Sequence, residues 1–187
     1  MMSDWEKGHT PAMFDFQPYL RGDLVTLGPL TADHMAALRG CAGDLRTWAD
    51  YPNAHLQASG DIDPWFSMGV NIARALIIEE AETGNVIGTS RYYEVPGHPT
   101  DIGIGFTFLT AASRRQGATN RELKRLMLTH AFKTVETVWF HVLPDNARSQ
   151  AAVKKLGARE AGEETLKLAA TPTLYRCFTL TQAQYLG

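Results

Sequence analysis

Cysteine is scarce in this 187-residue chain, and no metal-binding spacing occurs in it. The two cysteines, Cys41 and Cys177, lie far apart, so the chain has neither a Cys-x-x-Cys pair nor a disulfide framework. The six histidines are scattered and add no zinc-ligand spacing. This cysteine usage is typical of a reducing compartment, and we therefore expect a cytoplasmic protein that holds no metal.

Long apolar runs and a strong charge imbalance are also missing. No apolar run approaches the roughly 18 residues that a membrane-spanning helix needs. Asp4 and Glu6 stand where a secretory signal would be apolar. A net charge of −2 gives no electrostatic reason to bind a polyanion. These absences predict a protein that has neither nucleic acid nor a membrane as its partner.

The hydrophobic content of 44% is enough for one buried core. We expect an N-terminal arm over residues 1–18 and a single domain over residues 19–187. Hydrophobic periodicity and turn residues predict an alternation of strands and helices. The predicted strands cover residues 24–27, 76–80, 86–93, 101–109, 138–143, 161–168 and 175–180, and the predicted helices cover about 32–39, 44–49, 63–73, 119–133 and 146–156.

This order of elements predicts a mixed α/β fold of the α+β kind. The strands at 76–80, 86–93 and 101–109 are joined by short turns, so they should form an antiparallel meander. The strands at 101–109 and 138–143 are separated by a long helix. A strand, helix and strand in succession require a crossover, so these two strands should be parallel neighbours.

The loop between the strand at 101–109 and the long helix has the features of a phosphate site. The first turn of a helix presents backbone N–H groups without intrahelical partners, and Gly117 allows a ligand to approach them closely. Arg114, Arg115 and Arg121 add cationic groups. A polar loop whose arginines face water is the alternative. Ala118-Thr119-Asn120 after the glycine excludes a P-loop, and a single glycine excludes a dinucleotide fingerprint.

Three segments, in order, resemble the GNAT superfamily of acyl-CoA-dependent N-acetyltransferases, closest to the branch that contains ribosomal-protein N-terminal acetylases. They are the strand Ile104–Leu109, the loop Arg114–Thr119 and the helix start Asn146–Ser149, which is followed by Lys154–Ala158. The loop is similar to the family pattern Gln/Arg-x-x-Gly-x-Gly/Ala, except that Thr119 takes the place of the last small residue. The likeness runs from about Arg21 to Leu180 and is weakest before Leu76.

The resemblance implies acetyl-CoA as co-substrate and a sheet in which two parallel central strands splay apart between flanking helices. It places the thioester at main-chain amides near Phe108 and Leu109 and gives Asn146 the pantetheine arm. It makes Ser149 the donor of a proton to the leaving thiolate. Asn146 as a helix N-cap and Ser149 as an ordinary first-turn residue are the alternatives. The residues implied around the pyrophosphate are Arg114, Arg115, Gln116, Gly117, Ala118, Thr119 and Asn120.

The sequence departs from its relatives at two catalytic positions. Many relatives have a glutamate before the Ile-Gly of the thioester strand, where this chain has Gly103. Asp101 lies two residues earlier on the same strand face and could accept the proton of the amine, or it could be a solvated carboxylate at a strand start. A tyrosine that serves many relatives as general acid is replaced by Val153, which leaves Ser149 or solvent.

Candidate acceptor-binding residues come from several segments. Trp48, Tyr51, Arg91 and Tyr92 could line the acceptor pocket, although core packing explains the aromatic ones equally well. His141 could face the acceptor or be a hydrogen-bonded sheet histidine.

We expect transfer of the acetyl group to a primary amine, either a protein N-terminus or a small molecule, by direct attack in a ternary complex. The alternatives are a non-catalytic acyl-CoA-binding module or sensor, and an interaction protein that has lost the cofactor. The sequence leaves open whether the protein is a homodimer.

Overall fold

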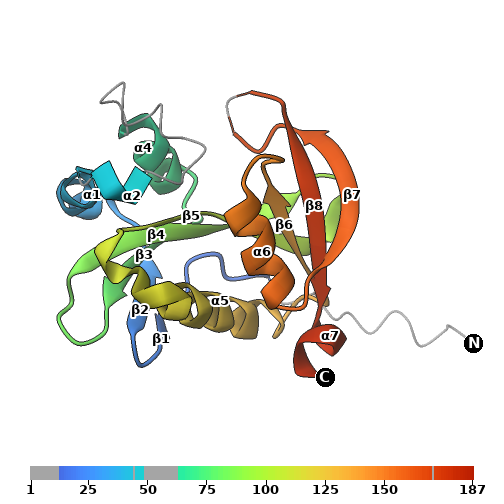
Figure 1. Cartoon of the computed structure of the whole chain (residues 1–187), viewed down its shortest axis with the longest axis horizontal. Coiled ribbons are helices and arrows are strands. Elements are labelled where there is room, and N and C mark those ends of the chain that lie inside the picture. The colour runs from blue at the N-terminus through green and yellow to red at the C-terminus, as the bar shows by residue number, and fades with distance from the viewer. Residues whose placement is uncertain (1–12, 44, 49–62, 170) are drawn as a thin grey trace, which may run out of the picture.

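The computed structural model describes residues 13–43, 45–48, 63–169 and 171–187, and its centre is one mixed sheet (Figure 1). The described strands follow the order β1-β2-β3-β4-β5-β6-β8-β7 across the sheet. Their bounds are β1 Leu20–Arg21, β2 Val25–Pro29, β3 Ala75–Glu80, β4 Val86–Val95, β5 His98–Leu109, β6 Thr137–Val142, β7 Arg159–Leu166 and β8 Thr173–Thr181.

Helices lie before, between and after these strands. The α-helices are α1 Met35–Ala42, α2 Leu45–Trp48, α4 Asp63–Asn71, α5 Ala118–Ala131, α6 Ala147–Lys155 and α7 Gln182–Leu186, and the 3-10 helices are η2 Ala32–His34 and η3 Ala112–Gly117. The predicted helices at 32–39, 44–49, 63–73, 119–133 and 146–156 correspond to α1, α2, α4, α5 and α6. The sequence did not reveal β1 or α7, because two and five residues are too short for a periodic pattern.

The predicted parallel pairing of β5 and β6 is confirmed, and it extends over only two residue pairs. Ile102 of β5 pairs with Val138 of β6, and Gly103 pairs with Trp139. Beyond these pairs β5 continues to Leu109 and β6 to Val142 without further pairing between them. The two strands therefore separate toward their carboxyl ends. The meander β3-β4-β5 is antiparallel, as predicted.

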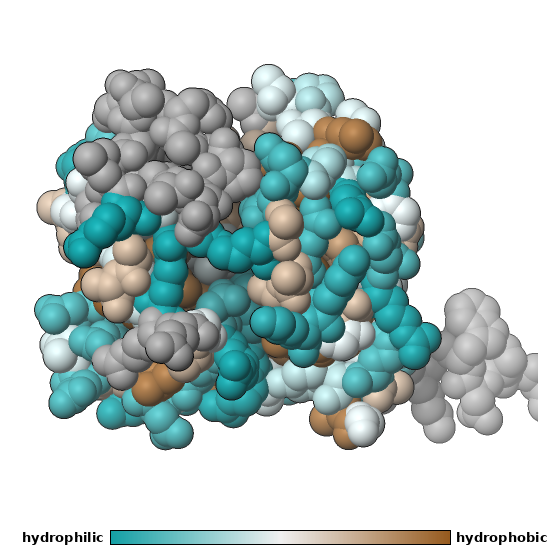
Figure 2. Space-filling view, viewed as in Figure 1, coloured by the Kyte–Doolittle hydropathy of each residue, from teal (hydrophilic) through white to brown (hydrophobic). Residues whose placement is uncertain are grey.

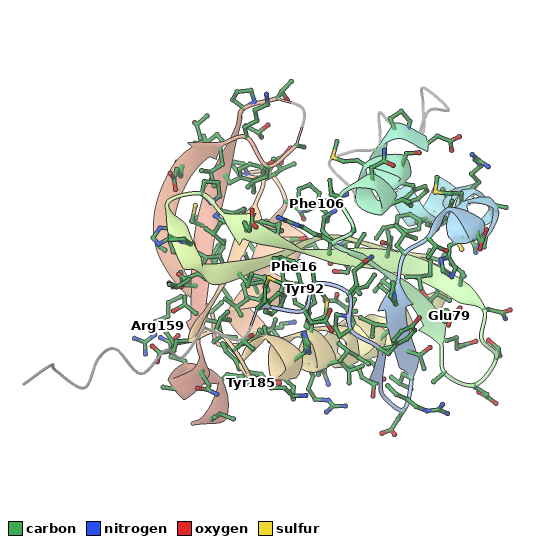
Figure 3. All side chains as sticks on the ribbon, turned by 180° about the vertical axis from the view of Figure 1, so that it is seen from behind. Phe16, Glu79, Tyr92, Phe106, Arg159 and Tyr185 are labelled. Carbon is green, nitrogen blue, oxygen red and sulfur yellow. The ribbon has the colours of Figure 1, made fainter. Side chains whose placement is uncertain are left out.

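Each face of the sheet buries its own core. Leu123 and Met127 of α5 pack on one face together with Tyr92 of β4. On the other face Phe66 of α4 packs with Phe108 of β5. Figure 3 shows Tyr92 on the α5 side of the sheet and Phe106 on the side of α4. Because neighbouring strand residues point to opposite faces, this division fixes which side chains can reach each side of the opening.

The described part of the N-terminal arm packs on the sheet through aromatic rings. The ring of Phe14 lies edge-on against Tyr92, with centroids 5.0 Å apart. The guanidinium of Arg74 lies 4.6 Å from the ring centre of Phe16. Gln17 donates a side-chain hydrogen bond to the carbonyl oxygen of Ala75. The division of the chain into an arm and one domain stays a prediction.

One carboxylate joins α5 to the turn between β1 and β2. Glu122 accepts hydrogen bonds from the main-chain N–H groups of Asp23, Leu24 and Val25, at 3.0, 2.6 and 2.9 Å. Its side chain is only 11% exposed. Three main-chain donors on one carboxylate fix this edge of the sheet to the helix.

We therefore expect Glu122→Ala to lower the free energy of unfolding by about 2 kcal/mol, because it leaves main-chain donors unpaired. Urea unfolding measures the change. Arg125→Ala is the matched control, since that guanidinium lies 3.8 Å from Glu122 and is 56% exposed. An exposed ion pair of this kind contributes at most about 1 kcal/mol. Equal unfolding midpoints for the two variants would contradict the role assigned to Glu122.

Among the described helices, none is long and apolar enough to cross a membrane. The described residues also contain no cluster of three or more His, Cys, Asp or Glu side chains that could hold a metal ion.

Candidate active site

The site is built around the opening between β5 and β6. On its β5 side the strand carries a bulge, since Arg91 pairs with Gly105 and Thr89 with Phe108, which leaves Ser90 opposite two residues. Phe106 in this bulge has a positive φ of 51°, which is rare for a bulky side chain. The irregularity turns the ring of Phe106 toward the face that carries Arg91, whose guanidinium lies 4.1 Å from the ring centre.

A chain of buried and half-buried polar groups supports the bulge from the α5 side. Lys124 donates from Nζ to Oγ1 of Thr107 at 2.6 Å, and this oxygen lies 2.9 Å from the hydroxyl of Ser90. Ser90 also lies 3.3 Å from the carbonyl oxygen of Gly105, to which it donates. Lys124 is 7% exposed, and burial lowers its pKa to about 7. Sequence reasoning missed Lys124 because nothing in a helical pattern marks a lysine as buried.

The predicted phosphate loop lies at the start of α5. Gly117 is the N-cap of this helix, with a left-handed φ of 90°, and Ala118, Thr119 and Asn120 form the first turn. A Cβ atom at Gly117 would have no heavy atom within 4 Å, so the loop backbone is open on this side. Backbone N–H groups at such a helix start are suited to an anion. The loop therefore fits a diphosphate group.

Two side chains that the sequence placed at the phosphate form hydrogen bonds within the protein, and their role at the phosphate stays a prediction. Thr119 is buried and donates its hydroxyl hydrogen to the carbonyl oxygen of Ser113. Arg114 donates to the carbonyl oxygen of Thr47 in α2 at 2.5 Å. The hydroxyl of Thr47 in turn accepts the main-chain N–H of Ala111 at 3.1 Å. These contacts hold the loop in shape and fasten it to α2. The side chains of Arg115 and Gln116 lie outside the described part of the structure.

Phe108 and Leu109 were predicted to serve through their main chain, and their side chains are used elsewhere. Phe108 is fully buried against Phe66, with ring centroids 5.9 Å apart. Leu109 is 4% exposed and belongs to the core under α5. Only the backbone of this segment can therefore take part in binding, and its role at the thioester stays a prediction.

At the start of α6 the structure shows a capping contact. Asn146 is the N-cap and accepts the main-chain N–H of Ser149 through Oδ1 at 3.1 Å. Ser149 is a half-buried residue of the first turn. Asn146 therefore acts as a helix N-cap, as one of the two alternatives expected. The roles of Asn146 at pantetheine and of Ser149 as proton donor stay predictions.

Asp101 is engaged at the paired end of β5. Its Oδ2 atom accepts the indole N–H of Trp139 at 2.8 Å, and its Oδ1 atom accepts the hydroxyl of Thr100 at 3.2 Å. The ring of His98 lies on Trp139, with centroids 4.4 Å apart. Asp101 precedes the two residues of β5 that pair with β6, whereas the opening follows them. Its position gives it a role in holding Trp139, and a role as base stays a prediction.

The predicted acceptor residues are divided between the two faces of the sheet. Tyr92 was wrongly placed in the acceptor pocket, because it has no exposed surface and donates its hydroxyl hydrogen to the carbonyl oxygen of Met127 at 2.8 Å. Arg91 lies on the opposite face, 4% exposed, where burial lowers its pKa to about 10. The side chain of Trp48 and all of Tyr51 lie outside the described residues.

His141 lies on the same face as Arg91, within a group of aromatic rings. It is stacked on Trp139, with centroids 5.7 Å apart and planes 6° apart. Its Nδ1 atom lies 2.9 Å from the hydroxyl of Tyr93. Burial, together with nearby His98, lowers the pKa of His141 to about 4. The sequence indicated His141 but not Tyr93. Tyr92 and Tyr93 are the same residue type and point to opposite faces of the sheet, so residue type alone could not identify the one at the site.

Tyr93 explains why the chain has glycine at position 103. A Cβ atom at Gly103 would lie 2.1 Å from the Tyr93 ring, and one at Gly105 would lie 3.2 Å from it. No side chain fits at Gly103 while the ring is there. Tyr93 also forms part of a groove of about 430 Å³, lined by Ile72, Arg74, Tyr93, Glu94, Pro96, Lys167 and Leu168.

From the side of α5 and α6 the described surface is mainly hydrophilic, with scattered apolar patches (Figure 2). On this side the starts of α5 and α6 belong to the two segments that follow β5 and β6. The structure therefore combines a splayed parallel strand pair and a helix start with an open backbone. On the face opposite α5 it carries a group of buried and half-buried aromatic and titratable side chains. This combination can bind an extended, phosphate-bearing molecule along the opening.

Comparison with known proteins identifies the class. Residues 25–159 match the model of the acetyltransferase (GNAT) domain, and the chain belongs to this family. The predicted family and the mixed fold are thereby confirmed, and the family assignment confirms acetyl-CoA as co-substrate. No functionally curated protein matches the sequence.

Solved structures share the fold over nearly the whole chain. A GNAT-family protein from Chromobacterium violaceum is 22% identical with a TM-score of 0.76, over 100% of this chain and 98% of that one. A protein assigned as a ribosomal-protein-serine acetyltransferase from Vibrio cholerae is 17% identical with a TM-score of 0.67, over 92% and 99%. Aminoglycoside acetyltransferase AAC(6')-Ib, solved with coenzyme A and kanamycin, is 17% identical with a TM-score of 0.64, over 87% and 97%.

Proposed function

We propose that the protein transfers the acetyl group of acetyl-CoA to a primary amine by direct attack in a ternary complex. The observation that best supports this proposal is the separation of β5 and β6 after the pair Gly103 and Trp139, together with the open backbone at Gly117. The opening can receive pantetheine as an added strand, and the start of α5 can bind the diphosphate. No covalent enzyme intermediate is required.

The side chains on the face opposite α5 support an amine as the acceptor. This face of β4 and β6 carries polar atoms and aromatic rings, which belong to Arg91, Tyr93, Trp139 and His141. Among the similar structures, an aminoglycoside acetyltransferase is solved with kanamycin, and another protein is assigned as a ribosomal-protein-serine acetyltransferase. We therefore propose a small molecule or a peptide N-terminus as the acceptor.

The test is the release of free thiol when the protein, acetyl-CoA and a panel of amines are incubated together. Turnover with at least one amine supports the proposal. Binding of coenzyme A without turnover on any amine favours a non-catalytic acyl-CoA sensor. A protein that has lost the cofactor would show no thermal shift with coenzyme A.

The acceptor amine should also determine the pH dependence. An α-amino group with a pKa near 8 is about 9% neutral at pH 7, whereas a lysine side chain near 10.4 is only about 0.04% neutral. We expect the acidic limb of the kcat/KM profile to follow the pKa of the acceptor, because only the neutral amine attacks. Alanine amide and Nα-acetyl-lysine form the matched pair. A limb at the same pH for both acceptors would contradict this expectation.

A further inference from the structure

The ring of His141 lies beside the opening between β5 and β6. Trp139 is the last residue of β6 that pairs with β5, and His141 follows two residues later. Residues two apart in a strand share a face, and the parallel stack of the two rings confirms this orientation. His141 thus lies where β6 has begun to separate from β5, on the face that also carries Arg91 and Tyr93.

The two ring nitrogens of His141 differ in their surroundings. Nδ1 is fixed by the hydroxyl of Tyr93 at 2.9 Å. Nε2 is buried and has no hydrogen-bond partner among the residues that the structure describes. A buried polar atom without a partner costs about 1–3 kcal/mol, and such atoms in native proteins call for an explanation. A ligand that binds Nε2 provides one.

Tyr93 is held rigidly enough to orient the imidazole. Its ring covers the two glycines of β5, Gly103 and Gly105, and lies edge-on to Phe106 with centroids 5.7 Å apart. The same ring lines the groove of about 430 Å³ between α4, β4 and the loop before β8. A molecule in this groove contacts Tyr93, and the next side chain toward β6 is His141.

We propose that Nε2 of His141 binds the acceptor amine and takes its proton, and that Tyr93 is the positioning residue that fixes the imidazole by accepting Nδ1–H. This proposal rests on the proposed acetyl transfer. The amine nitrogen forms a bond to the thioester carbonyl carbon, the C–S bond breaks, and coenzyme A leaves as a thiolate. One N–H proton passes to Nε2, and the thiolate takes a proton from Ser149 or water. The products are an amide and the free thiol, and His141 returns its proton to solvent.

The charges around His141 agree with a neutral imidazole. Its pKa of about 4 leaves the imidazole uncharged at neutral pH, so the lone pair of Nε2 carries no proton and can accept one from the amine. Burial also raises the pKa of Tyr93 above its usual range, which keeps the phenol protonated. The titratable and charged groups around the pair are Arg91 on β4, His98 and Asp101 on β5, and Tyr175 and Cys177 on β8.

The test compares His141→Asn with the wild-type protein, using acetyl-CoA and the best amine of the panel. Asparagine places a polar atom near the position of Nδ1 and removes Nε2. We expect kcat to fall by about tenfold or more, since proton transfer by a positioned side chain contributes at least this much. The KM for acetyl-CoA should stay within about twofold, because coenzyme A binds at α5 and β5. His130→Asn is the control, because His130 packs against Phe14 and Tyr92 on the opposite face of the sheet, and it should leave kcat unchanged.

Two further measurements separate a proton acceptor from a structural histidine. Added imidazole should restore part of the rate of His141→Ala, and it should not accelerate the wild-type protein. Tyr93→Phe keeps the ring over the glycines and should lower kcat while leaving the KM for acetyl-CoA unchanged. An unchanged kcat in a folded His141→Asn variant would overturn this proposal alone. Failure of the wild-type protein to acetylate any amine would overturn it together with the proposed function.

Discussion

Replacing Gly117 by valine is expected to weaken coenzyme A binding by about tenfold or more, measured by titration calorimetry. Gly117 has a φ of 90°, and a left-handed backbone costs an L-residue roughly 1–2 kcal/mol. A Cβ atom there would touch nothing, so the substitution acts through the backbone and not through a clash. Relief of the strain rotates the peptide units that present N–H groups at the start of α5.

Gly84 provides the control for this experiment. It has a φ of 71° in the turn between β3 and β4, and a Cβ atom there would likewise meet nothing within 4 Å. Gly84→Val carries the same kind of strain away from the loop, so it should lower stability without changing affinity for coenzyme A. Equal affinity of Gly117→Val and the wild-type protein would refute the placement of the diphosphate at this loop.

The second large effect concerns Lys124 and the dependence of stability on pH. Burial lowers the pKa of this lysine from 10.5 to about 7 in the folded protein. Between pH 7 and pH 10.5 the unfolded chain therefore binds the proton more strongly than the folded protein. Stability contributed by this group rises with pH across that window, by up to about 1.4 kcal/mol per pH unit. Below pH 7 both states are protonated, and the penalty of burying the charge is fully present.

Lys124→Met should flatten the rise in stability between pH 7 and pH 10.5, because methionine has nothing to titrate. Urea unfolding at several pH values measures the slope. Lys133→Met is the matched control, since Lys133 is exposed just after α5 and should leave the slope as it is in the wild-type protein. If Lys124→Met keeps the wild-type slope, the buried lysine is not the titrating group.

The sequence predicted the features that depend on local pattern and on connection length. A strand, a long helix and a second strand can be joined only by a crossover, which gave the parallel pairing of β5 and β6. The glycine before an amphipathic helix gave the position of the turn at the start of α5, and its role as a phosphate loop stays a prediction. Both conclusions need only residues that are near one another in the chain.

The features that the sequence could not give depend on neighbours across strands. Tyr92 and Tyr93 are indistinguishable by type, and only the register of β4 decides that one enters the core and the other faces His141. The bulge at Phe106 changes the alternation of β5, so counting by two along the strand fails there. The partner of Arg114 is Thr47, which a pattern of residues cannot reveal.

The attachment of α2 to the phosphate loop has a consequence for how the enzyme can evolve. Thr47 is fully buried and forms hydrogen bonds with both Ala111 and Arg114. These bonds join α2 to the segment that follows β5. Helix α2 is thereby anchored at the loop that we propose holds the diphosphate of acetyl-CoA. If that proposal holds, selection for a different amine that repositions α2 would also change coenzyme binding, unless Thr47 keeps its place.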